Sequence, residues 1–169
     1  MDVTSAAERA MGMSDAVWAR HASPWSVWSR FTCLPLLALA VWSRVWLGWW
    51  ALVPVALALF WIWWNPRAFP PPARTDNWAS KGTFGERVYL NRKAVPIPAH
   101  HELAASILAA GSGPGAVLLV YGLADLHLWA TLFGLFATMV PKIWFVDRMA
   151  WLYQDMRDAT PEYASWLKT

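Results

Sequence analysis

The stretch LAASILAAGSGPGAVLLVYGLADLHLWATLFGLFATMVPKIWFV, residues 103–146, decides the fold. It contains two apolar runs, residues 103–123 and 128–146, separated by the short polar turn ADLH at 124–127. A helix needs about 20 mainly apolar residues to cross the hydrocarbon core of a bilayer. Each run therefore predicts one transmembrane helix, and the tight turn between them predicts a hairpin.

The first half of the chain contains a second pair of apolar runs, residues 25–43 and 49–64. The strictly apolar part of the first run, residues 31–42, is short. It spans a bilayer only if Arg30 lies at the boundary and extends its side chain toward the headgroups. Gly48 is the residue expected to reverse the chain between these runs. The sequence thus predicts an all-α integral membrane bundle of four transmembrane helices.

The composition supports a membrane environment and excludes several other classes. Of the 169 residues, 57% are hydrophobic, 15% are charged and 15 are tryptophan, which argues against a disordered chain. The single cysteine, Cys33, cannot form an intrachain disulfide. The basic residues flank apolar runs and form no stripe with stacking aromatics, so no nucleic-acid partner is predicted. The first 20 residues lack an apolar core, and a cleavable signal peptide is not expected.

The distribution of Lys and Arg predicts the orientation. Four spans put both termini on one side of the membrane, together with the long 65–103 loop. Of 14 basic residues, Arg44 alone lies in an opposite-side turn, and Lys142 lies in the last turn of the fourth span. The remaining 12 lie on the side of the termini: Arg9, Arg20, Arg30, Arg67, Arg74, Lys81, Arg87, Arg92, Lys93, Arg148, Arg157 and Lys168. Cytoplasmic loops are enriched in Lys and Arg, which predicts cytoplasmic termini in a cell or inner membrane.

This topology divides the chain into five segments. They are a cytoplasmic N-tail (1–24) that can form an interfacial helix, a first hairpin (25–64), a cytoplasmic loop (65–103), a second hairpin (104–146) and a cytoplasmic helical C-tail (147–169). The loop and the C-tail together with the N-tail would form a small cytoplasmic cap.

Local signals predict where helices begin and end in the cap. Pro66 and the prolines at 70–72 are expected to end the second span. The string TFGE at 83–86 fits a capping box that opens a short helix through about Leu90. No helix breaker follows Val146, so the fourth span is expected to continue toward Met156. The string TPE at 160–162 reads as a helix N-cap followed by proline at the first helical position.

Twelve polar residues on the cytoplasmic side are candidate site residues: His21, Glu86, Arg87, Asn91, Arg92, His100, His101, Glu102, Asp147, Arg148, Tyr153 and Asp155. Imidazole and carboxylate groups suit zinc, iron or manganese, which makes His100, His101, Asp147 and Asp155 the candidate metal ligands. Adjacent histidines point about 100° apart on a helix, however, and are not expected to share one ion. Interfacial ion pairing is the simpler interpretation of the acidic residues.

No stronger catalytic motif accompanies these residues. The sequence contains no phosphate-binding glycine loop after a strand, no nucleophile elbow and no paired-cysteine motif. No catalytic residue, metal or cofactor is therefore firmly indicated.

The string GSGPG at 111–115 lies inside the third span. Small residues let two helix backbones approach closely in lipid, so Gly111, Gly113 and Gly115 are predicted to pack against another helix. The alternative is a helix break of the kind found in transporters. A transporter is expected to carry ionisable groups at mid-membrane, and the predicted spans carry none there.

Several strings are similar to a known family: HASPWSVW (21–28), NPR (65–67), GER (85–87), NRK (91–93), VPIPAHH (95–101) and WFVDRM (144–149). Over about residues 18–156 the chain resembles an uncharacterised family of small microbial multi-pass membrane proteins. The resemblance implies a membrane protein and concentrates the motifs on the inner face. Because that family has a domain of unknown function, it implies no catalytic residue and no substrate.

The sequence leaves three functions open. The first is a non-catalytic subunit or assembly factor of a larger membrane complex, whose partners are the lipid bilayer and other membrane proteins or a second copy. The alternative is a membrane enzyme with a metal or acid–base site at the cytoplasmic face, which requires at least three candidate side chains to converge. A transporter or channel is the weaker alternative. The absence of a catalytic motif favours the first.

Overall fold

The computed structural model describes residues 12–169, and all the regular secondary structure in this part of the chain is helical. The elements are α2 (Asp15–His21), α3 (Pro24–Arg30), α4 (Cys33–Trp42), α5 (Arg44–Leu47), the 3₁₀ helix η1 (Gly48–Ala51), α6 (Leu52–Ala68), α7 (Trp78–Leu90), α8 (Ala99–Ala124), α9 (Leu128–Met156) and α10 (Pro161–Ser165). The predicted all-α class is confirmed for the described residues. Residues 1–11, with Arg9 and much of the expected N-tail helix, lie outside them.

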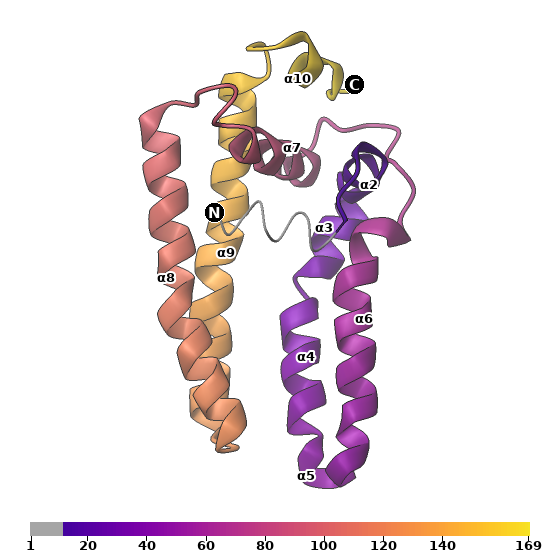
Figure 1. Ribbon diagram of the computed structural model, residues 1–169, viewed down its shortest axis with the longest axis vertical. Coiled ribbons are helices and arrows are strands. Elements are labelled where there is room, and N and C mark those ends of the chain that lie inside the picture. The colour runs from indigo at the N-terminus through magenta and orange to yellow at the C-terminus, as the bar shows by residue number, and fades with distance from the viewer. Residues whose placement is uncertain (1–11) are drawn as a thin grey trace.

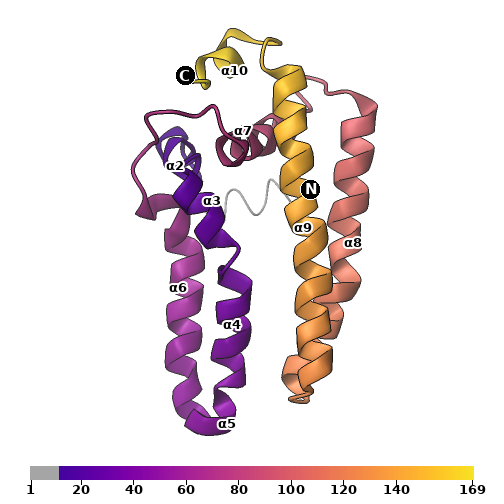
Figure 2. The same cartoon turned by 180° about the vertical axis from the view of Figure 1, so that it is seen from behind.

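Two long hairpins stand side by side and are joined at one end (Figure 1). In the first hairpin α4 and α6 run alongside each other, and in the second α8 and α9 do so (Figure 2). The helix α7 lies across the end where α2, α3 and α10 also gather. We call this end the cap.

Three helical segments are long and apolar enough to cross a membrane: Pro24–Ala68, Ala99–Ala124 and Leu128–Met156. Within their most apolar windows only 6%, 17% and 11% of the residues are buried by the protein itself. Few of the residues in these windows are therefore covered by the protein itself, which is the arrangement expected of helices solvated by lipid.

The first apolar run is interrupted, contrary to the expectation of one helix over 25–43. The helix α3 ends at Arg30 and α4 begins at Cys33. Pro35, in the first turn of α4, has no N–H to donate to the carbonyl of Phe31, and its ring crowds that carbonyl, which favours a break just before it. Gly48 reverses the chain as predicted, with φ +52° and ψ −129°, a conformation open essentially to glycine alone.

Two predicted boundaries in the cap are wrong. Pro66 does not end α6, which continues to Ala68 and stops before Phe69. Phe69 is extended, with φ −110° and ψ 149°, because the ring of Pro70 disfavours a helical conformation in the preceding residue. The helix α7 starts at Trp78, one and a half turns before the predicted capping box.

The side chain of Asn77 caps α7 by accepting a 3.0 Å hydrogen bond from the Ser80 amide. Thr83, the residue expected to cap, instead lies inside the helix and donates to the Ala79 carbonyl. Two other predictions hold. The helix α9 continues without a break to Met156, and Thr160 caps α10 by accepting from the Tyr163 amide.

Glycines set the close contact between α8 and α9. A Cβ on Gly115 would lie 2.5 Å from the backbone of Ala137 and Thr138. Gly122 faces Thr131, and Gly134 faces Leu119, in equally tight positions. These glycines let the two backbones touch along the hairpin.

The three glycines of the predicted packing motif, Gly111, Gly113 and Gly115, lie in different surroundings. Gly115 lies against α9, a Cβ on Gly111 would meet only the Pro141 ring at 3.9 Å, and a Cβ on Gly113 would meet nothing within 4 Å. The helix α8 is unbroken through Pro114. A discontinuous helix of the transporter type is therefore not present at this position.

The core of the cap lies where α7 crosses α9. Gly82 and Gly85 bring the α7 backbone against Val146 and Met149 of α9, and a Cβ on Gly85 would overlap the Met149 carbonyl. Around this crossing a cluster of buried side chains joins α7, α9 and α10: Phe84, Val88, Tyr89, Met149, Leu152, Tyr153, Met156 and Tyr163, with Ala22 and Ala105.

At the opposite end a single arginine links the two hairpins. Arg44, from the first hairpin, donates to the carbonyls of Leu123 (2.6 Å) and Ala124 (2.5 Å) in the last turn of α8. These carbonyls have no helical partner, and the positive charge also suits the C-terminal dipole of α8. Arg44 therefore caps the C-terminal end of α8.

Replacing Arg44 with alanine is expected to lower the free energy of unfolding by about 1–3 kcal/mol, the cost of leaving such acceptors unsatisfied. Arg44→Lys should recover part of the loss, because an ammonium group keeps the positive charge and N–H donors but lacks the fixed planar geometry with which Nη2 reaches both carbonyls. The measurement is the unfolding midpoint in mixed detergent micelles. Equal midpoints for Arg44→Ala and the wild type would contradict this role.

Candidate functional site

The candidate polar residues all lie at the cap, but they form several separate groups. Tyr153 is buried and donates to the carbonyl of Tyr163 at 3.0 Å. Glu86 lies 3.8 Å from Arg30, and Arg92 lies 3.6 Å from Glu102. These contacts are ordinary interfacial pairs within the cap. They agree with the interpretation that the acidic residues form interfacial ion pairs. The partner of Glu86 is Arg30 on α3 and not an arginine that neighbours Glu86 in the sequence.

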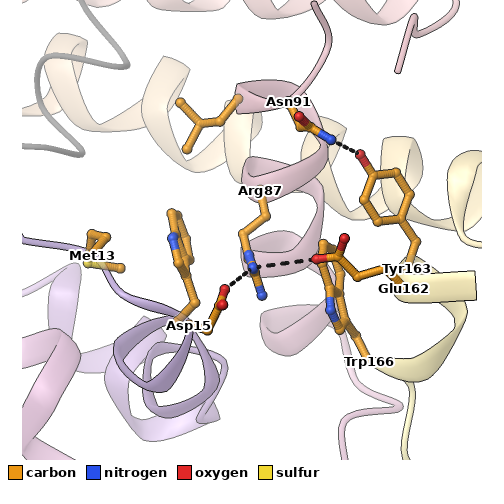
Figure 3. A pocket seen from close by; sticks show the side chains of 9 residues that line it. Met13, Asp15, Arg87, Asn91, Glu162, Tyr163 and Trp166 are labelled. Carbon is orange, nitrogen blue, oxygen red and sulfur yellow. Dashed lines mark hydrogen bonds and ion pairs between the residues drawn. The ribbon is translucent and has the colours of Figure 1, made fainter. Parts of the chain in front are cut away.

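Arg87 and Asn91 line a hollow of about 300 Å³ between α2, α7 and α10 (Figure 3). The Arg87 guanidinium lies 2.6 Å from Asp15 and 3.8 Å from Glu162. Its carbon atom also lies 4.3 Å from the ring centre of Trp166 and 5.8 Å from that of Trp18. Arg87 thus ties a helix before the first hairpin to a helix after the second.

The other residues that line the hollow also connect α7 to the two terminal segments. The Asn91 amide donates to the Tyr163 hydroxyl at 2.8 Å, and Met13 and Leu90 complete the wall. Asp15, Trp18, Glu162 and Trp166 were not among the candidates from sequence. No local spacing relates them to Arg87, since Asp15 lies 72 positions away in the chain. The hollow therefore lies where the segment before the first hairpin and the segment after the second hairpin pack against α7.

Asp147 does not join the proposed metal ligands. Its carboxylate accepts from the Trp78 indole N–H at 2.9 Å and from Arg148 at 2.8 Å. The Trp78 ring stacks on Trp28 of α3 at 5.5 Å. Asp147 therefore helps to join α9 to α7 and, through the two indoles, to the first hairpin. The Nε atom of Arg148 is buried and has no hydrogen-bond partner.

His21 belongs to a buried polar network and faces no open site. Its Nδ1 lies 2.8 Å from the Ser26 hydroxyl, which in turn donates to the Asn65 side chain at 3.2 Å. The Asn65 amide donates to the Ser29 hydroxyl at 2.7 Å. This network holds α2, α3 and α6 together. Burial, and secondarily the charge of Arg30, lower the pKa of His21 well below 6.5.

The lowered pKa of His21 predicts an acid-sensitive first hairpin. The unfolded chain takes up a proton on His21 below about pH 6.5, whereas the folded protein resists it. Stability should therefore fall with decreasing pH across the window between the folded and unfolded pKa values, by at most about 1.4 kcal/mol per pH unit. The free energy of unfolding in urea or denaturing detergent, measured between pH 7.5 and 5, reports this dependence on pH. In His21→Gln this part of the slope should disappear, and an unchanged slope would contradict the assignment.

His100, His101 and Asp155 come together where α8 begins and α9 ends. Their candidate ligand atoms all lie within 4.8 Å of one another. His101 is 4% exposed, and its Nε2 lies 2.8 Å from an oxygen of Asp155. The ring centres of His100 and His101 are 4.2 Å apart. The expectation that these adjacent histidines point apart is wrong, because in the first turn of α8 the exposed His100 ring folds over its neighbour.

Comparison with known proteins gives a family and no activity. The model of a family of unknown function, DUF6653, matches residues 2–168. The predicted membership of a family of unknown function is confirmed, and the match is longer than the resemblance seen in the individual motifs. No curated protein and no solved structure matches the chain.

Proposed function

Because this chain belongs to DUF6653, a family of unknown function, we propose its role from its own geometry: it is a four-span accessory subunit of a membrane complex. Both termini and the cap lie in the cytoplasm, and the hairpins bind another membrane protein. The observation that carries the proposal is the pair of hairpins, which are fastened to each other at their ends and expose nearly all their apolar length.

The length of the first apolar segment supports four crossings. Pro24–Ala68 has 45 residues, and as one straight helix it would be about 68 Å long, more than twice the hydrocarbon thickness. The chain instead reverses at Gly48, and α4 lies beside α6 (Figure 1). The helix α4 alone has 10 residues, and the ascending half reaches 19 residues, from 24 to 42, only when α3 at the edge of the cap is counted with it. The descending helix α6 supplies 17.

Charge and tryptophan positions support the orientation. Among the described residues, the basic groups lie on α2, α3 and α7, at the cap ends of α6 and α9, or in the segments beside these elements or α10, except Arg44 and Lys142. At the far end the exposed indoles are Trp46, Trp49, Trp50 and Trp129. Toward the cap they are Trp25, Trp28, Trp63, Trp64, Trp144 and Trp151. Basic residues favour the cytoplasmic face, and indoles favour both interfaces.

The outward faces of the spans support a binding role. In α9 an exposed stripe repeats every three or four residues: Trp129, Phe133, Phe136, Val140 and Trp144. The first hairpin makes few contacts with α8 and α9 along its length, in contrast with the close pairing inside each hairpin. In lipid, helices associate through packing surfaces, and a partner helix could lie against these faces without displacing any internal contact.

Site-specific photocrosslinking tests the accessory role. A photoreactive phenylalanine analogue replaces Leu39 in α4 or Phe136 in α9, both exposed, and Leu57 in α6 serves as the exposed control on the other helix of the first hairpin. The proposal predicts one adduct of defined mass from at least one of the first two positions in native membranes, and the same partner on purification in mild detergent. A lone monomer with no adduct at any position would contradict it.

A membrane enzyme is the second candidate, and one observation favours it. The alternative requires three of the candidate side chains to converge, and His100, His101 and Asp155 do so. These three side chains have the chemistry of a metal site, and a metal site by itself assigns no reaction.

A further inference from the structure

We infer that His100, His101 and Asp155 form a binding site for a divalent transition-metal ion, with zinc as the best-suited occupant. The three ligand atoms come from the beginning of α8 and the end of α9 and lie within 4.8 Å of one another. Two imidazoles and one carboxylate are ligands that zinc accepts in proteins with a fourth position left open. The inference is independent of the accessory role proposed above.

The three side chains differ in how firmly they are held. His101 is 4% exposed and packed into the cap, so its position is fixed before any ion arrives. His100 is exposed, and the Asp155 side chain is 54% exposed. Ligands around a tetrahedral zinc ion lie about 3.3 Å apart, from bond lengths of about 2.0 Å. The His101–Asp155 pair, at 2.8 Å, must therefore open slightly, and separations that approach 4.8 Å must close. The exposed side chains of His100 and Asp155 can make both adjustments without disturbing the core.

The hydrogen bond between His101 and Asp155 explains how the site is held ready. Nε2 of His101 and the carboxylate oxygen lie 2.8 Å apart, at hydrogen-bond distance. A metal ion would take the place of the hydrogen-bonded proton and move these two atoms slightly apart. Zinc binding should therefore release protons and weaken as the pH falls.

The helix ends around the cluster do not oppose a cation. The start of α8 carries partial positive charge, which alone would disfavour a metal ion. The end of α9 lies beside it with partial negative charge, because the two helices are antiparallel. With two neutral imidazoles, Asp155 leaves the cluster with one negative charge. The neighbouring Glu102 is paired with Arg92 at 3.6 Å.

Zinc titration of the full chain tests the site. The protein is purified in mild detergent with a tag that contains no histidine, is stripped with a chelator, and is titrated by calorimetry. Cobalt, whose absorption reports coordination, provides a second reading. The inference predicts one ion per chain and at least a tenfold weaker association in His100→Ala and in Asp155→Asn. Removing a residue that only orients a metal ligand typically weakens metal binding about 10–100-fold. Removing a ligand itself should weaken it at least as much.

Two control variants separate this site from general metal binding. Asp158→Asn removes an exposed carboxylate at the same end of the protein, and His127→Gln removes a histidine at the opposite end. Both should bind zinc as the wild type does. His100 is exposed, so His100→Ala should keep the wild-type elution volume and melting temperature without zinc. Asp155→Asn leaves a polar partner beside the buried His101 and should keep the wild-type elution volume. The inference is overturned if wild type binds no zinc, or if the controls lose as much affinity as the site variants.

Discussion

Replacing Gly85 with alanine should detach α7 from α9 and disassemble the cap. A Cβ at this position would overlap the backbone carbonyl of Met149, and Gly82 faces Val146 one turn earlier. Neither backbone can move without disturbing Phe84 and Val88, which are 5% and 0% exposed. Overpacking a core usually costs about 1–3 kcal/mol, and a clash with backbone should reach or exceed the upper end.

The unfolding free energy in mixed micelles, together with the rate of proteolysis in the cap, measures this effect. Gly113→Ala is the matched control, because it makes the same change within a helix where a Cβ meets nothing within 4 Å. Alanine has the higher helix propensity, so the control should be neutral or slightly more stable. Equal behaviour of Gly85→Ala and Gly113→Ala would contradict the close crossing of α7 and α9.

The second large effect is expected inside the α8–α9 hairpin. Gly115→Val would place a branched side chain where the Ala137 and Thr138 backbones lie 2.5 Å from the first added carbon. The helices must then separate or shift, which breaks the contacts at Gly122 and Gly134 in turn. A loss of about 3 kcal/mol or more is expected, at the high end for an overpacked interface.

Gly113→Val is the control for this substitution, two positions away in the same helix. A disulfide crosslink between cysteines placed across the hairpin, in a Cys33→Ala background, reports whether α8 and α9 remain paired. It should form in the control and fail in Gly115→Val. If it forms in both with equal yield, the glycine contact does not hold the hairpin together.

The second hairpin could be predicted from sequence because its signals are local. Two apolar runs of membrane length flank a polar turn, and Pro98 and Thr160 mark helix starts through their own backbone and side-chain chemistry. The start of α7 could not be predicted equally well. Both Asn77 and Thr83 can cap a helix, and the burial of Ala79 and Ser80 against neighbouring elements favours the earlier start.

The sequence predicts which polar residues lie at the cap but does not predict which of them contact one another. Arg87 meets Asp15 and Glu162 only because α2 and α10 converge on α7, and no sequence spacing encodes that convergence. The approach of His100 to His101 depends on a first-turn side chain that departs from ideal helical projection. Gly85 was quoted within a motif, yet its packing role needs the position of Met149 to be seen.

Cysteine accessibility in intact cells tests the four-span topology most directly. In a Cys33→Ala background, single cysteines replace Val45 or Asp125 in the turns far from the cap, and Lys81 or Asp158 within it. The account predicts that a membrane-impermeant maleimide labels Val45→Cys and Asp125→Cys from outside, and labels the other two only after the membrane is opened. External labelling of Lys81→Cys or Asp158→Cys, or protection of Val45→Cys, would contradict it.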